Sequence, residues 1–540
     1  MISVNNSSKL CQPQLLTLYH IPLLLAILLP FPYSNLMIAK TYSAIPYGYE
    51  GRIVEVEGDM NKGLPAFNIV GMANKTISEA RERVKSALVN SDFSFPDKKV
   101  TINLAPADLL KDGSYLDLPI ALSVMVLSRQ LLQEDLKDKL FVGELSLNGT
   151  LRPVHGIINI IETARAAGLT EIYLPLDNLP QAALISGVRL IGVKNLRELF
   201  LHLKGEKLII NPSPNVVENT KTDETGPILD HIRGQAFAKR ALTVAIAGHH
   251  NILISGPPGA GKTLLARAAA NLLPTPSPEE QIAITKIHSI AGETDGIVTA
   301  RPFRSPHHTS SSVSIIGGGN KAEPGEISLA HLGVLFLDEI PEFPRSVLES
   351  LRQPLEDKKI SISRANSKTT YPADFMLIAT MNPCPCGYLG DPTHECTCTQ
   401  TQINNYHKKL SGPLFDRIDM NITVSKVDNS DLRQTPIIDP AKPTEHSVVK
   451  NKITEAIARQ RTRYGRSDFY NSALTSHQVS TLLHLSPAAE QLLSSASEKL
   501  NLSARSYFKI IKVAQTIADL DASDIIDVPH LTEALNFRQR

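Results

Sequence analysis

The stretch "NILISGPPGAGKTLLARAAA", residues 251–270, decides the fold. Near its start, Ile252 to Ile254 form a short apolar run followed by a serine and a glycine, which is typical of a buried strand that leads into a loop. The stretch ends in a run of Ala and Leu, which is typical of a helix. Between them "GPPGAGKT" has the spacing G-x-x-x-x-G-K-[ST], which in this setting predicts a phosphate-binding loop. We therefore predict an α/β fold in which a parallel sheet with flanking helices binds a nucleotide.

Each residue of this loop has an expected task. Backbone N–H groups of the loop and the N-terminus of the helix are expected to surround phosphate oxygens. Lys262 would reach the β- and γ-phosphates, and Thr263 would offer its hydroxyl to Mg²⁺. A chance Gly-rich turn is the alternative, but a strand before the loop and a helix after it favour the nucleotide site. The expected contacts are Gly256, Pro257, Pro258, Gly259, Ala260, Gly261, Lys262 and Thr263.

A second motif, "GVLFLDEIPEF" at residues 333–343, places two acids after an apolar strand. Burying a carboxylate is unfavourable unless a cation or hydrogen bonds compensate for its lost hydration. Asp338 is expected to hold Mg²⁺ directly or through water, and Glu339 to orient or deprotonate the attacking water. The two motifs in this order predict an ATPase with ATP and Mg²⁺ as cofactors.

Composition and local patterns divide the chain of 540 residues into about three or four units. Residues 37–204 alternate strand and helix signals, and residues 205–226 have the Pro-, Asn- and Thr-rich composition of a linker. Residues 227–430 form the α/β unit with the two motifs, and residues 431–540 are expected to be helical. The net charge is +1, so nucleic-acid binding would need a local basic patch.

Residues 1–36 differ from the rest of the chain. "IPLLLAILLPFP", residues 21–32, has the length of a signal-peptide core and is too short to span a bilayer. Lys9 is the one Lys or Arg before it, and ordinary soluble sequence begins at Met37. We interpret the segment as an upstream extension from a misplaced start codon, with a weak membrane anchor as the alternative. No stable membrane association is expected.

Five segments of the chain carry a resemblance to a known family: "ISGPPGAGKTLLARAAA", "FRSPHHTSSSVSIIGGG", "PGEISLAHLGVLFLDEIPEF", "TMNPCPCG" and "SGPLFDRID". Together they resemble the magnesium-chelatase-like AAA+ ATPases, and more closely the bacterial YifB/ComM branch. The likeness extends from about Met37 to the C-terminus, with the segments in the same order and at fitting spacing. It implies a P-loop AAA+ module with a helical lid, in an oligomer that resembles a ring-forming hexamer.

The resemblance also implies roles for residues outside the two motifs. Asn382 matches the sensor residue whose amide polarises the lytic water. Arg417 matches the arginine finger, which reaches into the site of the neighbouring subunit and is worth about 10³- to 10⁵-fold in rate. Arg505 matches the sensor arginine of the helical lid. A surface salt bridge is the alternative for each arginine. The segment expected to contact adenine is "DHIRGQ", with Asp230, Ile232, Gly234 and Gln235.

Two further segments are candidates for the pore of such a ring. Residues 303–319 show no helix or strand period, and in the family this region is an insert that projects towards the pore. Residues 358–370 predict a β-hairpin that could face the pore and bind DNA phosphates, or be an ordinary solvated hairpin. Its basic residues are Lys358, Lys359, Arg364 and Lys368.

Four of the five cysteines gather in "CPCGYLGDPTHECTC", residues 384–398. This is not a secreted disulfide framework, and it favours a reducing cytoplasm. Four thiolates suit a structural Zn²⁺ if the loop folds back, although C-x-C is tighter than the usual spacing. His394 is a substitute ligand, and four free thiols are the alternative. The expected zinc ligands are Cys384, Cys386, Cys396 and Cys398.

The first unit resembles the proteolytic α+β domain of Lon through "LAPADLLKDGSYLDLPIALSV" and "GELSLNGTLRPVHG". Lon has a serine and a lysine where this chain has Tyr115 and Ile158, and no lysine lies between Leu151 and Leu169. A nucleophilic serine needs a base within hydrogen-bond reach, and Ser114 has no such lysine. We expect a Lon-like, non-proteolytic domain, of the type found in magnesium-chelatase relatives, that contacts a partner or DNA.

The leading hypothesis is an ATP-driven ring motor that acts on DNA, because ComM-like proteins are associated with recombination, branch migration and natural transformation. A metal-insertion subunit like that of magnesium chelatase, or a remodeller of protein partners, is the alternative. Tyr115 and Ile158 oppose an ATP-dependent protease. A nucleotide-gated scaffold without turnover is opposed by the intact Lys262, Asp338, Glu339 and Arg417.

Overall fold

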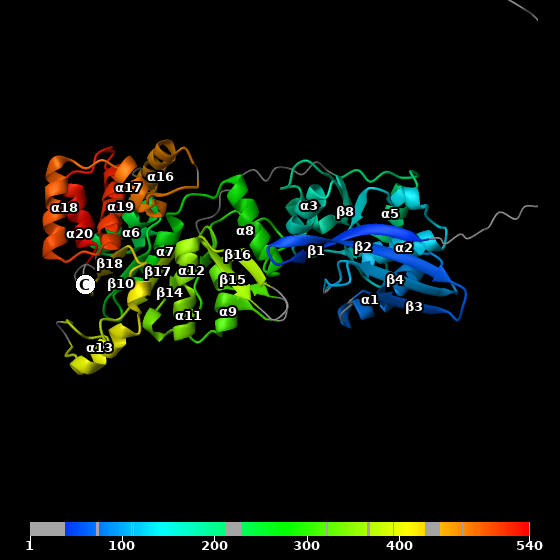
Figure 1. The fold of residues 1–540 in the computed structure, drawn as a ribbon, viewed down its shortest axis with the longest axis horizontal. Coiled ribbons are helices and arrows are strands. Elements are labelled where there is room, and N and C mark those ends of the chain that lie inside the picture. The colour runs from blue at the N-terminus through cyan, green and yellow to red at the C-terminus, as the bar shows by residue number, and fades with distance from the viewer. Residues whose placement is uncertain are drawn as a thin grey trace, which may run out of the picture.

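The computed structural model describes most of the chain from residue 38 onward. The predictions for residues 1–36, for most of the linker and for Arg364 lie outside the described residues. Figure 1 shows the first α/β unit at one end of the molecule, the second in the middle and the C-terminal helices at the other end. The described ranges are 38–71, 75–109, 111, 113–211, 228–319, 322–363, 368–391, 394–426, 443–466 and 468–538.

The first unit is built on a seven-stranded mixed sheet of order β3-β4-β2-β1-β5-β8-β9. Helices α1 and α2 cover one face and α3 the other, so alternate residues of the strands enter two separate cores. The strands are β1 (Ala39–Tyr47), β2 (Glu50–Asn61), β3 (Ala66–Val70), β4 (Lys99–Ala105), β5 (Lys139–Phe141), β8 (Glu171–Pro175) and β9 (Arg189–Val193), with the small hairpin β6 (Glu144–Leu145) and β7 (Leu151–Arg152). The helices are α1 (Lys75–Asn90), α2 (Asp117–Leu127), α3 (Ile157–Ala166), α4 (Leu179–Ala182) and α5 (Leu196–Leu203).

The second unit contains a five-stranded sheet of order β11-β14-β17-β10-β18, in which every pairing is parallel. Its central strands are continuous runs of apolar residues because helices bury both faces. The carboxyl ends of all strands therefore lie at one edge, as the two nucleotide motifs require. The strands are β10 (Ile252–Ser255), β11 (Phe303–Arg304), β14 (Val334–Leu337), β17 (Met376–Met381) and β18 (Met420–Thr423).

Alternation along these strands separates two cores. Ile252 and Ile254 pack with α6, α7 and the C-terminal helices, whereas Leu335 and Leu337 pack with α10 to α12 on the opposite face. Two short β-ladders lie outside the sheet. The helices are α6 (Ala236–Gly248), α7 (Lys262–Asn271), α8 (Pro278–Ile290), α9 (Ser312–Ile316), α10 (Glu326–Leu329), α11 (Arg345–Ser350), α12 (Arg352–Asp357), α13 (Gln400–Lys408) and α14 (Gly412–Phe415). The ladders are β12 (Gly317–Gly318) with β13 (Glu323–Pro324), and β15 (Lys359–Ser363) with β16 (Lys368–Pro372).

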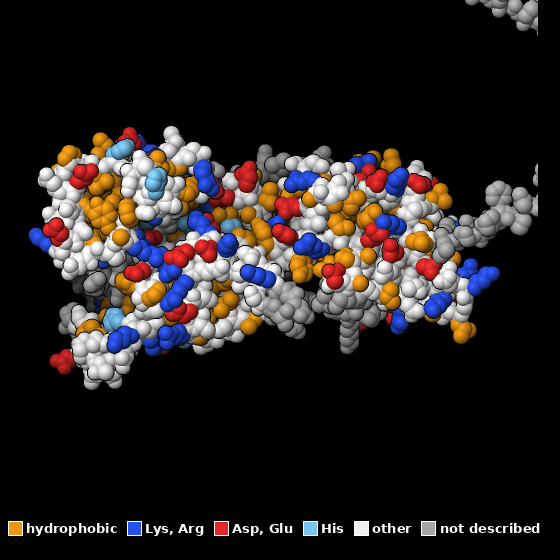
Figure 2. All heavy atoms as spheres, viewed as in Figure 1, with side chains coloured by type: hydrophobic (Ala, Val, Ile, Leu, Met, Phe, Trp, Pro, Cys, Tyr) orange, Lys and Arg blue, Asp and Glu red, His pale blue; other side chains and the backbone are white. Residues whose placement is uncertain are grey.

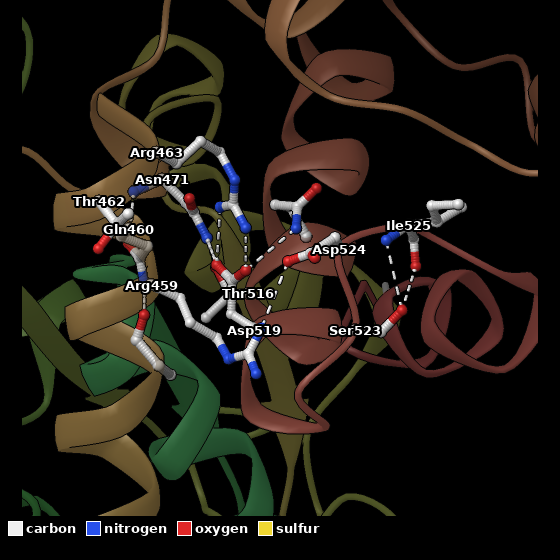
Figure 3. A network of polar contacts seen from close by, with 12 residues as sticks. Arg459, Gln460, Thr462, Arg463, Asn471, Thr516, Asp519, Ser523, Asp524 and Ile525 are labelled. Carbon is white, nitrogen blue, oxygen red and sulfur yellow. Dashed lines mark hydrogen bonds and ion pairs between the residues drawn. The ribbon is translucent and has the colours of Figure 1, made fainter. Parts of the chain in front are cut away.

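The C-terminal helices form a lid that is fixed by buried polar contacts (Figure 3). Asp519 is buried and accepts hydrogen bonds from Arg463, Asn471 and Gln515. Because each partner satisfies a charge or amide that would otherwise be costly to bury, the network makes one arrangement of the helices strongly preferred. The helices are α16 (Glu445–Tyr464), α17 (Ser476–Leu482), α18 (Pro487–Lys499), α19 (Ala504–Leu520) and α20 (Val528–Asn536).

Helix α8 joins the first unit to the second. Lys286 on α8 pairs with Glu162 and lies 4.1 Å from the centre of the Tyr49 ring. Ser289 accepts the backbone N–H of Gly156 at 2.9 Å. The first unit is thus attached to the helix that follows α7 in the chain.

Residues 303–319, whose sequence shows no helix or strand period, contain the edge strand β11, one turn of helix in α9 and the start of a ladder. Elements of two to five residues are too short to produce a period. Within the described residues, no helix is both long and apolar enough to cross a membrane.

Candidate nucleotide-binding site

The phosphate-binding loop lies between β10 and α7, as its sequence predicts. Gly259 and Gly261 adopt φ values of +77° and +81°, which side chains other than glycine rarely allow. A Cβ atom on Gly256 would lie 2.5 Å from the carbonyl oxygen of Val424, so only glycine permits this approach of the loop to the end of β18. The backbone N–H groups at the start of α7 are left to bind an anion.

Lys262 is the first residue of α7, and its side chain is buried. The ammonium donates hydrogen bonds to the carbonyl oxygen of Gly256, to that of Pro257 at 3.1 Å and to Oδ1 of Asn382 at 2.9 Å. Burial lowers the pKa of Lys262 from its usual value, and the charges of Asp338 and Glu339 oppose that shift. The ammonium is therefore held at the loop by three oxygen atoms.

The two residues expected at Mg²⁺ lie together. Thr263 Oγ1 donates a hydrogen bond to Asp338 Oδ2 at 3.1 Å, and Thr380 donates one to Oδ1 of the same carboxylate. Asp338 directly follows β14, which pairs in parallel with β17 and so brings Thr380 alongside. A hydroxyl and a carboxylate are oxygen donors of the kind that Mg²⁺ prefers.

Glu339 adopts the left-handed conformation, with φ of 52°, which is uncommon for a residue other than glycine. Such a conformation costs about 1–3 kcal/mol and persists where the surroundings fix it. Here the N–H of Glu339 donates to Thr380 Oγ1 at 3.0 Å, and Asn382 Nδ2 donates to Glu339 Oε1 at 3.3 Å. Asn382 thus joins Lys262 to Glu339 at the carboxyl edge of the sheet.

The segment expected to contact adenine also adjoins the loop. Ile232 is buried, and Gln235 Nε2 donates to the carbonyl oxygen of Ser425 at 2.6 Å and to that of Ala260 at 3.4 Å. The carboxylate of Asp230 accepts the N–H groups of Glu445 and His446 at the start of α16. It caps a lid helix, as acids do at helix N-termini.

Arg417 and Arg505 lie together, at a place apart from these residues. Both guanidinium groups pair with Glu356 on α12, at 2.7 Å for Arg417 and 2.8 Å for Arg505. Their charge holds the pKa of Glu356 below its usual value, with the hydrogen bond from Arg417 as the largest cause. The structure therefore brings the two arginines to one carboxylate.

Neighbouring contacts fix which edge of the sheet the arginines occupy. Arg417 precedes β18 by three residues, and Asp419 accepts the N–H of Asn251, which precedes β10. Lys509, one turn after Arg505 on α19, donates to the carbonyl oxygen of Ile418 at 2.7 Å. These are the amino ends of parallel strands whose carboxyl ends carry the phosphate loop, about 13 Å away for a four-residue strand.

Comparisons with known proteins agree with this architecture. The family models described as "Subunit ChlI of Mg-chelatase", "Magnesium chelatase, subunit ChlI" and "Magnesium chelatase, subunit ChlI C-terminal" match residues 56–178, 228–432 and 444–538. Competence protein ComM of Haemophilus influenzae is 41% identical over 506 residues, which are 93% of this chain and 97% of that protein. YifB of Escherichia coli is 40% identical over 511 residues, with the same coverage of both chains. The chain belongs to the YifB/ComM family of magnesium-chelatase-like AAA+ proteins.

A shorter similarity connects this YifB/ComM-family chain to magnesium chelatase itself. The magnesium-chelatase 67 kDa subunit of Chlorobaculum parvum is 27% identical over 156 residues, which are 28% of this chain and 23% of that protein. The likeness to the whole length of ComM and YifB is thus much broader.

The four clustered cysteines converge as expected. Their Sγ atoms all lie within 4.8 Å of one another, and the four thiols are free. His394 stands outside this group, with its ring stacked on Tyr388 at 4.9 Å between centroids. The group that could hold a metal ion is therefore made of thiols alone.

In the first unit, Ser114 donates a hydrogen bond to Glu144, and Ile158 is fully buried in α3. Lys111, the nearest lysine before Ser114, is buried and donates to the backbone carbonyl oxygen of Leu104 at 2.9 Å. Desolvation lowers the pKa of Lys111. Among the described residues of the first unit, no serine side chain is hydrogen-bonded to a lysine, and the absence of proteolysis stays a prediction.

Two residues that contact the candidate site residues were not identified in the sequence analysis. Thr380 contacts both Asp338 and Glu339, and its signal was a polar residue inside the apolar strand "FMLIATMN". Glu356 pairs with both arginines, but it stands in a stretch of ordinary charged residues. No local pattern distinguishes it.

Proposed function

We propose that the chain hydrolyses ATP as one subunit of a ring, with each nucleotide bound between two copies. The observation that carries the proposal is the division of the site between two edges of one sheet. Lys262 and Glu339 lie at the carboxyl edge, whereas Arg417 and Arg505 lie at the amino edge. A guanidinium at the amino edge of one copy would reach the γ-phosphate that is bound at the carboxyl edge of a neighbouring copy.

Within one copy, the carboxyl edge supplies binding and water activation. Lys262 would exchange its carbonyl partners for the β- and γ-phosphates of ATP. Thr263 and Asp338 would hold Mg²⁺, which neutralises the charge that develops on the phosphates. Glu339 would accept a proton from the attacking water, with Asn382 fixing the position of its carboxylate.

The neighbouring copy would then supply positive charge to the transferring phosphoryl group. The shared partner Glu356 and Arg505 are each 44% exposed, so their pairing is accessible to a competing anion, whereas Arg417 is 13% exposed and would have to turn outward to reach one. A phosphate carries more charge than a carboxylate and accepts a bidentate guanidinium equally well. Assembly would thus complete each site.

DNA is the proposed substrate of the ring, in recombination, branch migration or natural transformation. The similar protein of Haemophilus influenzae is named for competence. Figure 2 shows basic and acidic side chains interspersed on the face in view, so DNA contact would be local. In the hairpin β15–β16, Lys359 and Lys368 are exposed, whereas Lys358 pairs with Asp374. Each of these two exposed lysines could contact one phosphate of a DNA backbone.

A metal-insertion subunit is the second candidate, because the family models carry the name of magnesium chelatase. Similarity over 93% of the chain to ComM, against 28% to a chelatase subunit, favours the motor on DNA. Zn²⁺ at the four cysteines is the remaining proposed cofactor.

The test is the ATPase rate of the full chain with single-stranded, duplex and branched DNA, with the particle mass measured in parallel. We expect an oligomer whose turnover rises with one class of DNA. Lys359→Ala/Lys368→Ala should weaken that stimulation and leave DNA-independent turnover unchanged. A particle of one chain that leaves ATP intact with every DNA would contradict the proposal.

A further inference from the structure

The four-cysteine cluster has the geometry of a metal site. The Sγ atom of Cys384 lies 3.3 Å from that of Cys386 and 3.6 Å from that of Cys396, and Cys386 and Cys396 are also 3.6 Å apart. Four thiolates at about 2.3 Å from a tetrahedral Zn²⁺ would be about 3.8 Å from one another. A disulfide needs about 2.05 Å. The sulfurs are therefore grouped as ligands of one ion are.

The two Cys-x-Cys pairs meet across the base of a loop. The N–H of Cys386 points at the sulfur of Cys398 from 3.4 Å, a contact that favours a charged thiolate. Between the end of β17 at Met381 and the start of α13 at Gln400, the described residues form no helix or strand. A segment with so little regular structure needs another source of order, and a metal ion supplies it in many small modules.

This segment packs directly on the phosphate-binding loop. Gly387 has φ of +83°, and a Cβ atom on it would lie 2.8 Å from Cγ and Cδ of Pro258. Gly387 follows Cys386, and Asn382 precedes Cys384 by two residues. The cluster thus stands between the sensor residue and the loop that would bind the phosphates.

Further along the chain, the segment also contacts Lys426, which lies next to the residue that Gln235 contacts. Asp391 forms an ion pair with Lys426 at 2.6 Å, and the carbonyl oxygen of the adjacent Ser425 accepts the hydrogen bond from Gln235. The ring of Tyr388 lies 5.6 Å from the Lys426 ammonium. The segment therefore contacts Pro258 of the loop on one side and Lys426, the neighbour of the residue that Gln235 contacts, on the other.

We propose that Cys384, Cys386, Cys396 and Cys398 bind one Zn²⁺, and that the ion clamps this segment against Pro258, so that ATP turnover requires zinc and reduced thiols. Soft thiolates in a tetrahedral group select zinc over the hard Mg²⁺ of the phosphate site. The effect on turnover rests on the proposed ATPase function, whereas zinc binding does not.

The first experiment counts metal in the purified full chain. Elemental analysis should give one zinc per chain, released when a mercurial reagent titrates the thiols. Cys396→Ser/Cys398→Ser should lose the zinc, and Cys11→Ser, which removes the cysteine outside the cluster, should keep it. No zinc, iron in its place, or a disulfide among the four cysteines in freshly reduced protein would each overturn the assignment. This count holds whether or not the chain hydrolyses ATP.

The second experiment separates the clamp from the ion. Gly387→Ala places a methyl group against Pro258 and leaves all four cysteines, so zinc should stay at one per chain while turnover falls about tenfold, as for other residues that orient a metal site. Gly390→Ala is the matched control, because Gly390 has φ of +80° in the same loop and no atom lies within 4 Å of its added Cβ.

Two results would overturn the clamp. One is equal turnover in Gly387→Ala and Gly390→Ala. The other is full turnover of wild-type protein after its zinc has been removed with the mercurial reagent and a chelator. If the double cysteine variant fails to fold, the glycine pair and the zinc-depleted wild type still decide the outcome. Wild-type protein without ATPase activity would contradict the proposed function and leave the zinc count intact.

Discussion

The two edges of the parallel sheet differ in how complete they are within one chain. At the carboxyl edge, Lys262 bonds to Asn382, Asn382 to Glu339, and Thr263 to Asp338, so the residues hold one another in place. At the amino edge, Arg417 and Arg505 converge on Glu356, a carboxylate on a half-exposed side chain.

This difference indicates what each edge needs. At the carboxyl edge the polar groups already contact one another, so under the proposed function they are preorganised except for Lys262, which would exchange its carbonyl partners for phosphates. The amino edge carries two guanidinium groups that lie away from the phosphate loop of their own chain. This position suits residues that would complete the nucleotide site of another copy. The following experiments test whether the two edges act in this way.

The largest effect is expected at the amino edge. Arg417→Ala should assemble normally and lower turnover by about 10³-fold or more, because an arginine finger stabilises charge in the transition state. ATPase rate and particle mass are the measurements. Arg459→Ala, which removes a partly exposed guanidinium paired with Asp524, is the control and should keep full turnover.

Mixing two inactive variants shows whether Arg417 acts on another copy. Arg417→Ala retains Glu339, and Glu339→Gln retains Arg417, so a mixed ring would contain some interfaces with both groups intact. Activity should reappear on mixing. Two variants that stay inactive together, although mass measurements show mixed rings, would place the arginine in its own chain's site and end the proposed division between edges.

At the carboxyl edge, Glu339→Gln should bind ATP as tightly as the wild type and lower turnover by about 10²- to 10⁴-fold. The amide keeps the size of the side chain, and the Mg²⁺ ligands are untouched, but it does not accept a proton from water. A fluorescent ATP analogue measures binding, and phosphate release measures turnover. Glu342→Gln changes an exposed acid paired with Lys409 and should act as wild type. Retained turnover in Glu339→Gln would show that another residue activates the water.

The carboxyl edge was predictable from the sequence because its residues belong to continuous motifs. The phosphate loop, Asp338 with Glu339, and Asn382 each follow an apolar strand, and parallel strands bring their ends together. The amino edge was not predictable in the same way. Its geometry depends on where α19 packs and on Glu356, which lies 149 residues from Arg505 in the chain.

The order of the strands and the short elements were also beyond the sequence. The apolar runs gave the positions of β10, β14 and β17, but their neighbours in the sheet follow from long-range packing. Residues 303–319 contain elements of two to five residues, whose pattern is too short to recognise. Thr380 was visible only as a polar residue in an apolar strand, and its two partners gave it a role.

A smaller effect, on stability, is expected where the lid joins the amino edge. Asp419 accepts the N–H of Asn251 at 3.0 Å and lies 3.6 Å from the Lys509 ammonium. Asp419→Asn would leave that largely buried ammonium without its counter-charge, so docking of the lid should weaken by about 3–5 kcal/mol. Hydrogen exchange of α19 in urea measures the change. Asp524→Asn, at a largely exposed acid, is the control.

The pH dependence of this contact has a definite sign. Burial alone would raise the pKa of Asp419, but Lys509, His250 and the N–H of Asn251 outweigh it and hold the pKa well below its usual range. A depressed carboxyl pKa stabilises the fold above the unfolded value of about 3.9, and the contribution is lost as pH falls towards the folded value. The stability difference between wild type and Asp419→Asn should therefore begin to shrink as the pH falls below about 4, and a constant difference there would contradict the assignment.

The smallest effect concerns Glu356, which holds both arginines before any neighbour is present. Its side chain is 44% exposed, and exposed ion pairs are worth less than about 1 kcal/mol, so Glu356→Gln should change ring assembly by at most about fivefold. Because the arginines would no longer have to leave a carboxylate, the protein concentration at half-maximal ATPase rate should fall. Glu349→Gln, which removes the partner of Arg352 on the preceding helix, controls for the loss of a surface charge. If the protein concentration at half-maximal ATPase rate rises for Glu356→Gln but not for Glu349→Gln, the carboxylate of Glu356 aligns the arginines for the neighbouring site. The amino edge would then be as preorganised as the carboxyl edge.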